Sequence, residues 1–160
     1  MRRVFKYAVA VLALAAGVSS EAQAQTVRLT AVMSGANETP GVLTGAAGTA
    51  EVFVNLATQA VNYEIEIFNM PSGTTAGHFH VGGPGLAGPV VVDLAPPVNA
   101  SNDFALRGSA SPSQLRARPD QGIRSWDDFI QSLVGGQVYV NIHSAVNPGG
   151  ELRGQLTVAK

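Results

Sequence analysis

The chain contains no cysteine among its 160 residues. Disulfides, thiolate zinc sites, catalytic thiols and lipid-modified cysteine anchors are therefore excluded. Charged residues are also scarce, at 13%, and the formal net charge is −1 with no run of Lys or Arg. This composition excludes a coiled coil and argues against binding to nucleic acid, which needs a basic surface. Aromatic residues are few, at 6%, and no basic residues are interleaved with them, which argues against single-stranded nucleic acid as well.

Long apolar runs are absent except near the start, where Tyr7–Val18 is apolar over twelve residues. Basic residues precede this run, and Ala22–Ala24 follows it as a small-x-small cleavage sequence. This layout predicts a secretory signal peptide over residues 1–24, with residues 25–160 as a single domain that is secreted or periplasmic. The alternative is a membrane anchor, but a spanning helix needs about 20 residues. We therefore expect no membrane span after removal of the signal.

The domain that follows is rich in turn-forming residues, with 18 Gly and 9 Pro in the whole chain. Short alternating segments predict strands. One helix is predicted between a Ser125 cap and Gly135. The pattern indicates an all-β fold, an antiparallel Greek-key-like β-sandwich or flattened barrel with one short helix. The predicted strands are Val27–Met33, Ala50–Leu56, Val61–Ile67, Thr75–Val81, Pro89–Leu94, a hairpin of Phe104–Ala110 with Gln114–Arg118, Gln137–His143 and Leu152–Val158.

Three histidines are the main candidates for chemistry: His78, His80 and His143. Because successive strand side chains point to opposite faces, His78 and His80 share one face while Phe79 faces the core. By the same parity, His143 lies opposite the apolar set that includes Val140. Three imidazoles on the outer surface, covered by nearby loops, form a candidate site for copper or zinc with nitrogen ligands only. The alternative is that each histidine is an ordinary surface residue.

Arg153 lies on the polar parity of its strand, beyond the turn that follows His143. Its guanidinium is a candidate for attracting a small anion toward the site. The alternative is a salt bridge with Glu151 or Glu38, and Glu38 itself is either a structural acceptor or a site residue. No Ser-His-Asp order, phosphate loop or paired-carboxylate arrangement is present, which argues against a hydrolase.

Several motifs in fixed order closely resemble the CHRD domain family, first named from chordin. The resemblance runs from about Val27 to Val158 and implies an exported β-rich module. In chordin such domains sit beside regions that engage growth factors, so an extracellular protein is one expected partner. The segments that carry the resemblance are Asn37–Pro40, Gly77–Gly82 with Gly85 and Gly88–Pro89, Tyr139–Ser144 and Asn147–Gln155.

A looser resemblance to copper-zinc superoxide dismutase rests on the His-x-His strand, the Val-x-x-His of Val140–His143 and a Gly-rich loop before Arg153. It implies that His78, His80 and His143 are copper ligands and that Arg153 guides the anion. The chain has no fourth histidine for a bridging ligand and no disulfide, so the resemblance extends only to a mononuclear copper site. We expect an exported copper-binding protein, with superoxide as a candidate oxidant. The alternative is a non-catalytic module that binds an extracellular protein or matrix.

Overall fold

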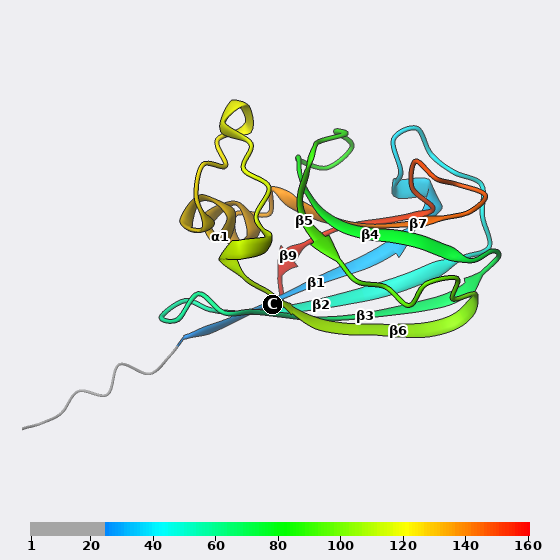
Figure 1. Ribbon diagram of the computed structural model, residues 1–160, viewed down its shortest axis with the longest axis horizontal. Coiled ribbons are helices and arrows are strands. Elements are labelled where there is room, and N and C mark those ends of the chain that lie inside the picture. Colours follow the sequence, from blue (N-terminus) through cyan, green and yellow to red (C-terminus); the bar gives the residue numbers. More distant parts are fainter. Residues whose placement is uncertain (1–24) are drawn as a thin grey trace, which may run out of the picture.

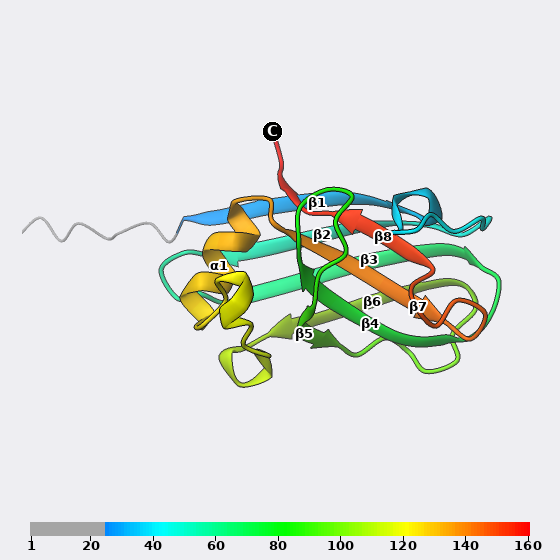
Figure 2. The ribbon, with the colours of Figure 1, turned by 90° about the horizontal axis from the view of Figure 1, so that it is seen from above.

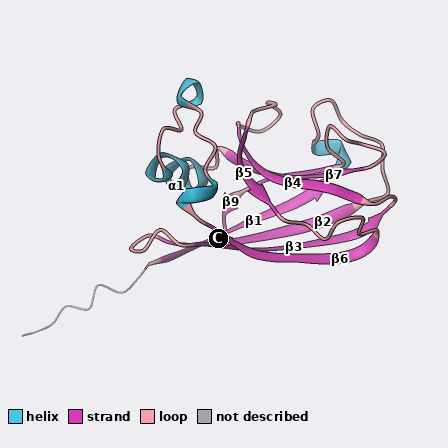
Figure 3. Ribbon diagram, in the orientation of Figure 1, coloured by secondary structure: helices cyan, strands magenta, loops and turns pink. Residues whose placement is uncertain are grey.

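The computed structural model describes residues 25–160 (Figure 1). The predicted signal peptide, residues 1–24, lies outside the described residues. Nearly all of the regular structure is antiparallel strand, with one α-helix, as Figure 3 shows, which confirms the predicted fold class. The strands are β1 (Thr26–Ser34), β2 (Ala47–Asn55), β3 (Val61–Met70), β4 (Thr74–Val81), β5 (Val90–Leu94), β6 (Asn102–Ala110), β7 (Val138–Ser144), β8 (Leu152–Gln155) and β9 (Thr157–Val158).

The strands form one sheet that folds over itself, in the order β5-β4-β7-β8-β1-β2-β3-β6 with β9 on β1. Seen from above, β4, β7 and β8 cross obliquely over β1, β2 and β3 (Figure 2). The result is a flattened barrel of two layers. The chain passes from one layer to the other between β3 and β4. In the second layer β4 pairs with β7, which is distant from it in sequence.

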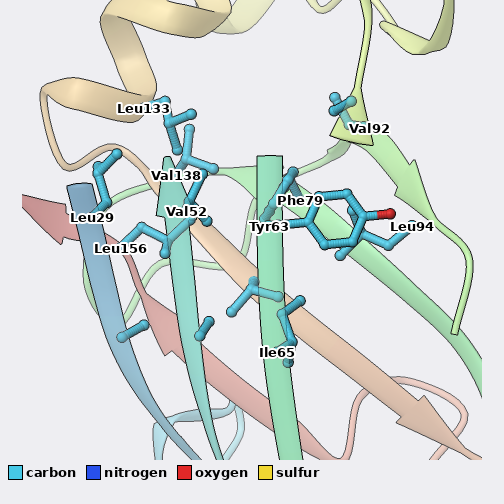
Figure 4. Packing of buried hydrophobic residues seen from close by; sticks show 14 of the residues in the cluster. Leu29, Val52, Tyr63, Ile65, Phe79, Val92, Leu94, Leu133, Val138 and Leu156 are labelled. Carbon is cyan, nitrogen blue, oxygen red and sulfur yellow. The ribbon is translucent and has the colours of Figure 1, made fainter. Parts of the chain in front are cut away.

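The space between the layers is filled by the apolar side chains that alternate along each strand. Phe79 of β4 is fully buried and meets Tyr63 of β3 edge-on, with ring centroids 5.8 Å apart. Figure 4 shows these two rings packed with Leu94 and, further along the core, with Val138 and Leu156. Burying Phe79 and its neighbours directs the opposite side chains of β4, including both of its histidines, out of the core.

Helix α1 (Trp126–Val134) covers one end of the barrel. Ser125 and Asp128 form a capping box at its start, and Gly135 ends it, as predicted. Trp126, Phe129 and Leu133 turn inward to the core. The Trp126 Nε1–H donates to the Gln59 carbonyl at 3.0 Å, which ties the helix to the β2–β3 turn.

Two predicted strands differ from the structure. Gln114–Arg118 does not pair with β6. It begins in a short 3-10 helix, η2 (Pro112–Gln114), and makes two isolated bridges, from Leu115 to Val92 of β5 and from Arg118 to Ile123. Pro112 and Pro119, which lack a backbone donor, limit regular pairing there. Leu152–Val158 is interrupted at Leu156, which turns fully into the core and separates β8 from β9.

The outer face of β4 and β7 is covered by three connections (Figure 1). These are the loop after β1, which contains η1 (Gly35–Asn37), the β4–β5 loop at 82–89 and the β7–β8 loop at 145–151. A further 3-10 helix, η3 (Pro119–Gln121), lies before α1. Within residues 25–160, no helix combines the length and apolar character needed to cross a bilayer.

Candidate metal centre

The three histidines come together on the outer face of β4 and β7. In the register of these strands, His78 lies opposite Asn141, and His143 lies opposite Ala76, two pairs further along. Directly opposed residues share a face of the sheet, and their diagonal neighbours are within reach of ring side chains. The predicted parity of all three histidines is therefore what the structure shows, and their proximity follows from the pairing of β4 with β7.

The imidazoles are close enough to share an ion after a small adjustment. His78 Nδ1 lies 3.0 Å from His143 Nε2, and one ring nitrogen from each of the three residues lies within 4.8 Å of the others. Ligands that each bind at about 2 Å span at most about 4 Å. The widest separation must therefore shrink by about 1 Å for all three nitrogens to reach one ion.

Each imidazole has an oxygen facing its outer nitrogen. His80 Nδ1–H donates to the Gly88 carbonyl at 2.8 Å, and His143 Nδ1–H donates to the Pro148 carbonyl at 2.8 Å. His78 Nε2 lies 3.5 Å from the Asp93 carboxylate, on the strand that pairs with β4. Metal-binding histidines almost always use their second nitrogen in this way, because the bond fixes the tautomer and the ring orientation.

The inner nitrogens face one another, and the one on His80 has no hydrogen-bond partner. Since the Gly88 and Pro148 carbonyls accept protons from the outer nitrogens, Nε2 of a neutral His80 or His143 is an acceptor. His80 Nε2 is buried and has no hydrogen-bond partner. His78 Nδ1 lies 3.0 Å from His143 Nε2, so the Nδ1–H tautomer of His78 donates a hydrogen bond to His143. In the other tautomer, with the proton on Nε2 toward Asp93, two lone pairs face each other at this distance. A cation between the rings relieves this arrangement.

Burial also keeps the rings neutral. Burial, with a smaller contribution from His143, lowers the pKa of His78. Burial lowers the pKa of His80 to about 4, against the opposing hydrogen bond to Gly88. Neutral imidazole is the form that binds metal, so these two ligands need not lose a proton near neutral pH.

Tyr139 of β7 stacks on His80, with ring centroids 4.8 Å apart and planes inclined by 12°. Arg153 of β8 places its guanidinium carbon 3.5 Å from the centre of the same tyrosine ring. Because β7 lies between β4 and β8, Tyr139 is held between the two side chains. The tyrosine hydroxyl also meets Gly88, donating to its carbonyl at 3.2 Å and accepting from its N–H at 3.1 Å. Rotation of the His80 ring is therefore restricted.

Arg153 is 2% exposed and is engaged with the β4–β5 loop. Its Nη2 donates to the carbonyls of Gly83 at 3.1 Å and Leu86 at 2.9 Å, and its Nη1 contacts Thr39 Oγ1 at 3.3 Å. Among residues 25–160 it has no salt bridge, so neither Glu151 nor Glu38 is its ion-pair partner. The geometry shows Arg153 holding the loop beside the histidines, and guidance of an anion stays a prediction.

Glu38 and Asn141 form a second polar contact on this face. Asn141 is 3% exposed, and its Nδ2 donates to Glu38 Oε1 at 2.6 Å. Burial raises the pKa of Glu38 to about 7, against the lowering effects of the Asn141 bond and the Arg153 charge. Glu151 is instead buried in the β7–β8 turn, where it accepts from Ser144 Oγ at 2.7 Å and Asn147 Nδ2 at 2.5 Å. Both acidic residues therefore have structural partners.

Three residues beside the histidines, Asp93, Tyr139 and Asn141, were not predicted from the sequence as part of the site. Asp93 is the only charged residue in the apolar run Val90–Leu94, and that contrast could have indicated it. Tyr139 and Asn141 share the parity of His143, so the same alternation could have included them. The Gly88 and Pro148 carbonyls carry no side-chain signal, because any residue supplies a backbone acceptor.

Comparison with known proteins gives one match. The family model for the CHRD domain matches residues 29–156, which is most of the chain and nearly all of the described fold. No curated protein and no solved structure shows a significant match. The matched span includes all three histidines, Arg153 and the three loops around them. Because the family model matches well over half of the chain's length, the chain belongs to the CHRD domain family.

Proposed function

We propose that this CHRD domain binds one transition-metal ion, with copper as the first candidate, through His78 Nδ1, His80 Nε2 and His143 Nε2. The observation that carries the proposal is that the two nitrogens of each imidazole ring have different surroundings. The outer nitrogens face two carbonyls and a carboxylate, and the inner nitrogens face one another, with His80 Nε2 buried and without a partner. With the His78 proton on Nε2, toward Asp93, a cation would satisfy all three inward lone pairs at once.

An imidazole-only donor set suits copper and zinc among the common metals. Copper bound there would supply one-electron redox chemistry, and superoxide is the candidate small oxidant. Arg153 gives limited support to anion guidance, since its guanidinium is occupied by loop carbonyls. We therefore place ion binding ahead of catalysis. Export is part of the proposal, supported by the pattern over residues 1–24 and by the family; N-terminal sequencing of protein recovered outside the cytoplasm should then begin at Gln25.

The test is a titration of the purified protein with Cu(II), Cu(I) under anaerobic conditions and Zn(II), each as the metal alone. We expect one ion per chain, and no comparable binding in a variant with His78, His80 and His143 all changed to Ala. These are the only histidines in the chain, so a histidine signal in the copper spectrum can come from nowhere else. Asn62→Ala, exposed on β3 of the other layer, is the matched control. Equal stoichiometry and affinity in the triple variant would overturn the proposal.

A non-catalytic binding module is the second candidate function. It is favoured by apolar side chains exposed on the three loops, namely Leu43, Leu86 and Val146, which are 103%, 64% and 68% exposed. Exposed apolar residues of this size are typical of protein-binding surfaces when they are contiguous. If the chain binds no metal in the titration above, these exposed residues favour its assignment as a non-catalytic binding module.

A further inference from the structure

Of the three oxygen groups that face the outer nitrogens of the histidines, one carries a charge. His80 and His143 donate to backbone carbonyls, whereas the outer nitrogen of His78 faces the carboxylate of Asp93. Asp93 is directly opposite His78 in the β4–β5 register, so this contact is built into the pairing of two strands. A carboxylate on the outer N–H raises the electron density at the inner nitrogen and so strengthens it as a ligand.

The same carboxylate has a second partner on its other oxygen. Arg116 Nε donates to Asp93 Oδ2 at 2.8 Å, while His78 Nε2 lies 3.5 Å from Oδ1. Arg116 is held beside β5 because its backbone N–H donates to the Val91 carbonyl at 2.8 Å and because Leu115 bridges to Val92. Asp93 therefore lies between a candidate ligand and a fixed positive charge, and Arg116 draws part of its negative charge away from His78.

We propose that Asp93 and Arg116 are positioning residues that set the metal preference of the three-histidine site with opposite signs. Asp93 strengthens His78 as a ligand and favours the more highly charged ion, Cu(II) or Zn(II), over Cu(I). Arg116 limits that effect by competing for the carboxylate. This inference rests on the proposed function, because it concerns how tightly the same site holds each ion.

The two residues suit a clean experiment because neither belongs to the core. The Asp93 side chain is 44% exposed and that of Arg116 is 52% exposed, so their substitution leaves the packing between the layers intact. Asp93→Asn should weaken Cu(II) and Zn(II) binding about tenfold, the lower end of the range for loss of an outer-shell partner. Arg116→Gln should strengthen binding of both ions about threefold, as expected for removing one positive charge several ångströms away in a solvated setting.

Cu(I) affinity and the copper reduction potential provide the readouts that a purely structural role would not move. Because Cu(I) carries less charge, Asp93→Asn should weaken Cu(I) binding less than Cu(II) binding and so raise the Cu(II)/Cu(I) potential. Arg116→Gln should lower the potential. Glu64→Gln and Arg107→Gln form the matched control pair, since they remove an exposed carboxylate–arginine contact between β3 and β6 on the other layer. Far-UV circular dichroism and urea unfolding of every variant check that the fold is retained.

Opposite shifts in the Asp93 and Arg116 variants, with the control pair unchanged, support the inference. Weakened binding in both variants would show that the pair only stabilises the local structure, and the inference would be overturned. It would also be overturned if both variants bound all three ions as the parent chain does. A parent chain that takes up no stoichiometric ion would instead refute the proposed function itself, before either variant is compared.

Discussion

At the scale of single residues, Arg153 shows how burial decides the role of a charged side chain. On sequence parity it was a candidate for guiding an anion, and on the structure it is 2% exposed with loop carbonyls at two of its donors. A planar guanidinium can reach two carbonyls and stack on Tyr139 at the same time. The ammonium group of lysine cannot make these contacts together, although it keeps the positive charge. Replacing arginine by lysine therefore separates anchoring of the loop from guidance of an anion.

We expect Arg153→Lys to loosen the β4–β5 loop although the charge is retained. The free energy of unfolding should fall by about 2 kcal/mol, because buried loop carbonyls lose their donors. Amide exchange of Leu86, whose N–H donates to the Gly83 carbonyl, should become at least tenfold faster as measured by NMR. Arg28→Lys, at an exposed ion pair with Glu51, is the control. Unchanged exchange together with weakened anion capture would favour the guidance role instead.

At the scale of elements, the β4–β5 loop acts as the support of the His80 side of the site. Its Gly88 carbonyl accepts from His80 Nδ1, and Tyr139 contacts both polar groups of the same residue. The loop lies so close to its own strand that a Cβ at Gly88 would be 1.7 Å from the Val81 carbonyl oxygen. Gly88 is therefore required by a close backbone approach rather than by an unusual φ.

Gly88→Ala should displace this loop and weaken metal binding by tenfold or more, with a loss of stability that urea unfolding would measure. The matched control is Gly83→Ala in the same loop, where an added Cβ would meet nothing closer than Gln137 Oε1 at 3.4 Å. Metal titration of both variants checks the prediction. Similar affinities in the two would mean that the Gly88 contact does not position His80.

At the scale of the whole molecule, two partly buried groups, His80 and Glu38, make the stability of the fold respond to pH in opposite directions. The pKa of His80 is lowered from 6.5 to about 4 by burial, so its contribution is present above pH 6.5 and is lost as the pH falls toward 4. The pKa of Glu38 is raised from 4.5 to about 7, chiefly by burial, so its contribution is present below pH 4.5 and is lost as the pH rises through 7. His78, whose pKa is also lowered, acts in the same direction as His80.

In metal-free protein, Glu38→Gln should therefore make the fold more sensitive to acid. Without Glu38, only the histidines make the free energy of unfolding depend on pH in this range, and they lower it as the pH falls. The variant should therefore lose about 1–2 kcal/mol more stability than the parent chain between pH 7 and pH 5. Urea unfolding at a series of pH values, with chelator present, measures the difference. Glu64→Gln, at an exposed residue of β3, serves as the control. Parallel stability curves for the parent and Glu38→Gln would contradict the prediction.

The sequence by itself determined the local features of this protein. The strands of the alternating segments, the caps of α1 and the shared face of His78, His80 and His143 all follow from periods of two or from cap chemistry, which depend on near neighbours in the chain. The CHRD motifs likewise pointed to the family that the comparison shows. The same local signals could not predict that Gln114–Arg118 leaves the sheet, because the bridge to β5 is a long-range contact.

Only the tertiary structure decided which strands are neighbours, and with it the composition of the site. The pairing of β4 with β7 brings His78 and His143 to 3.0 Å although 64 residues separate them, and the β4–β5 register places Asp93 beside His78. Burial of Arg153 depends on the β4–β5 loop folding back over β8. Sheet order and loop cover are set by packing of the whole chain around one core, and that balance has no signature in any single segment.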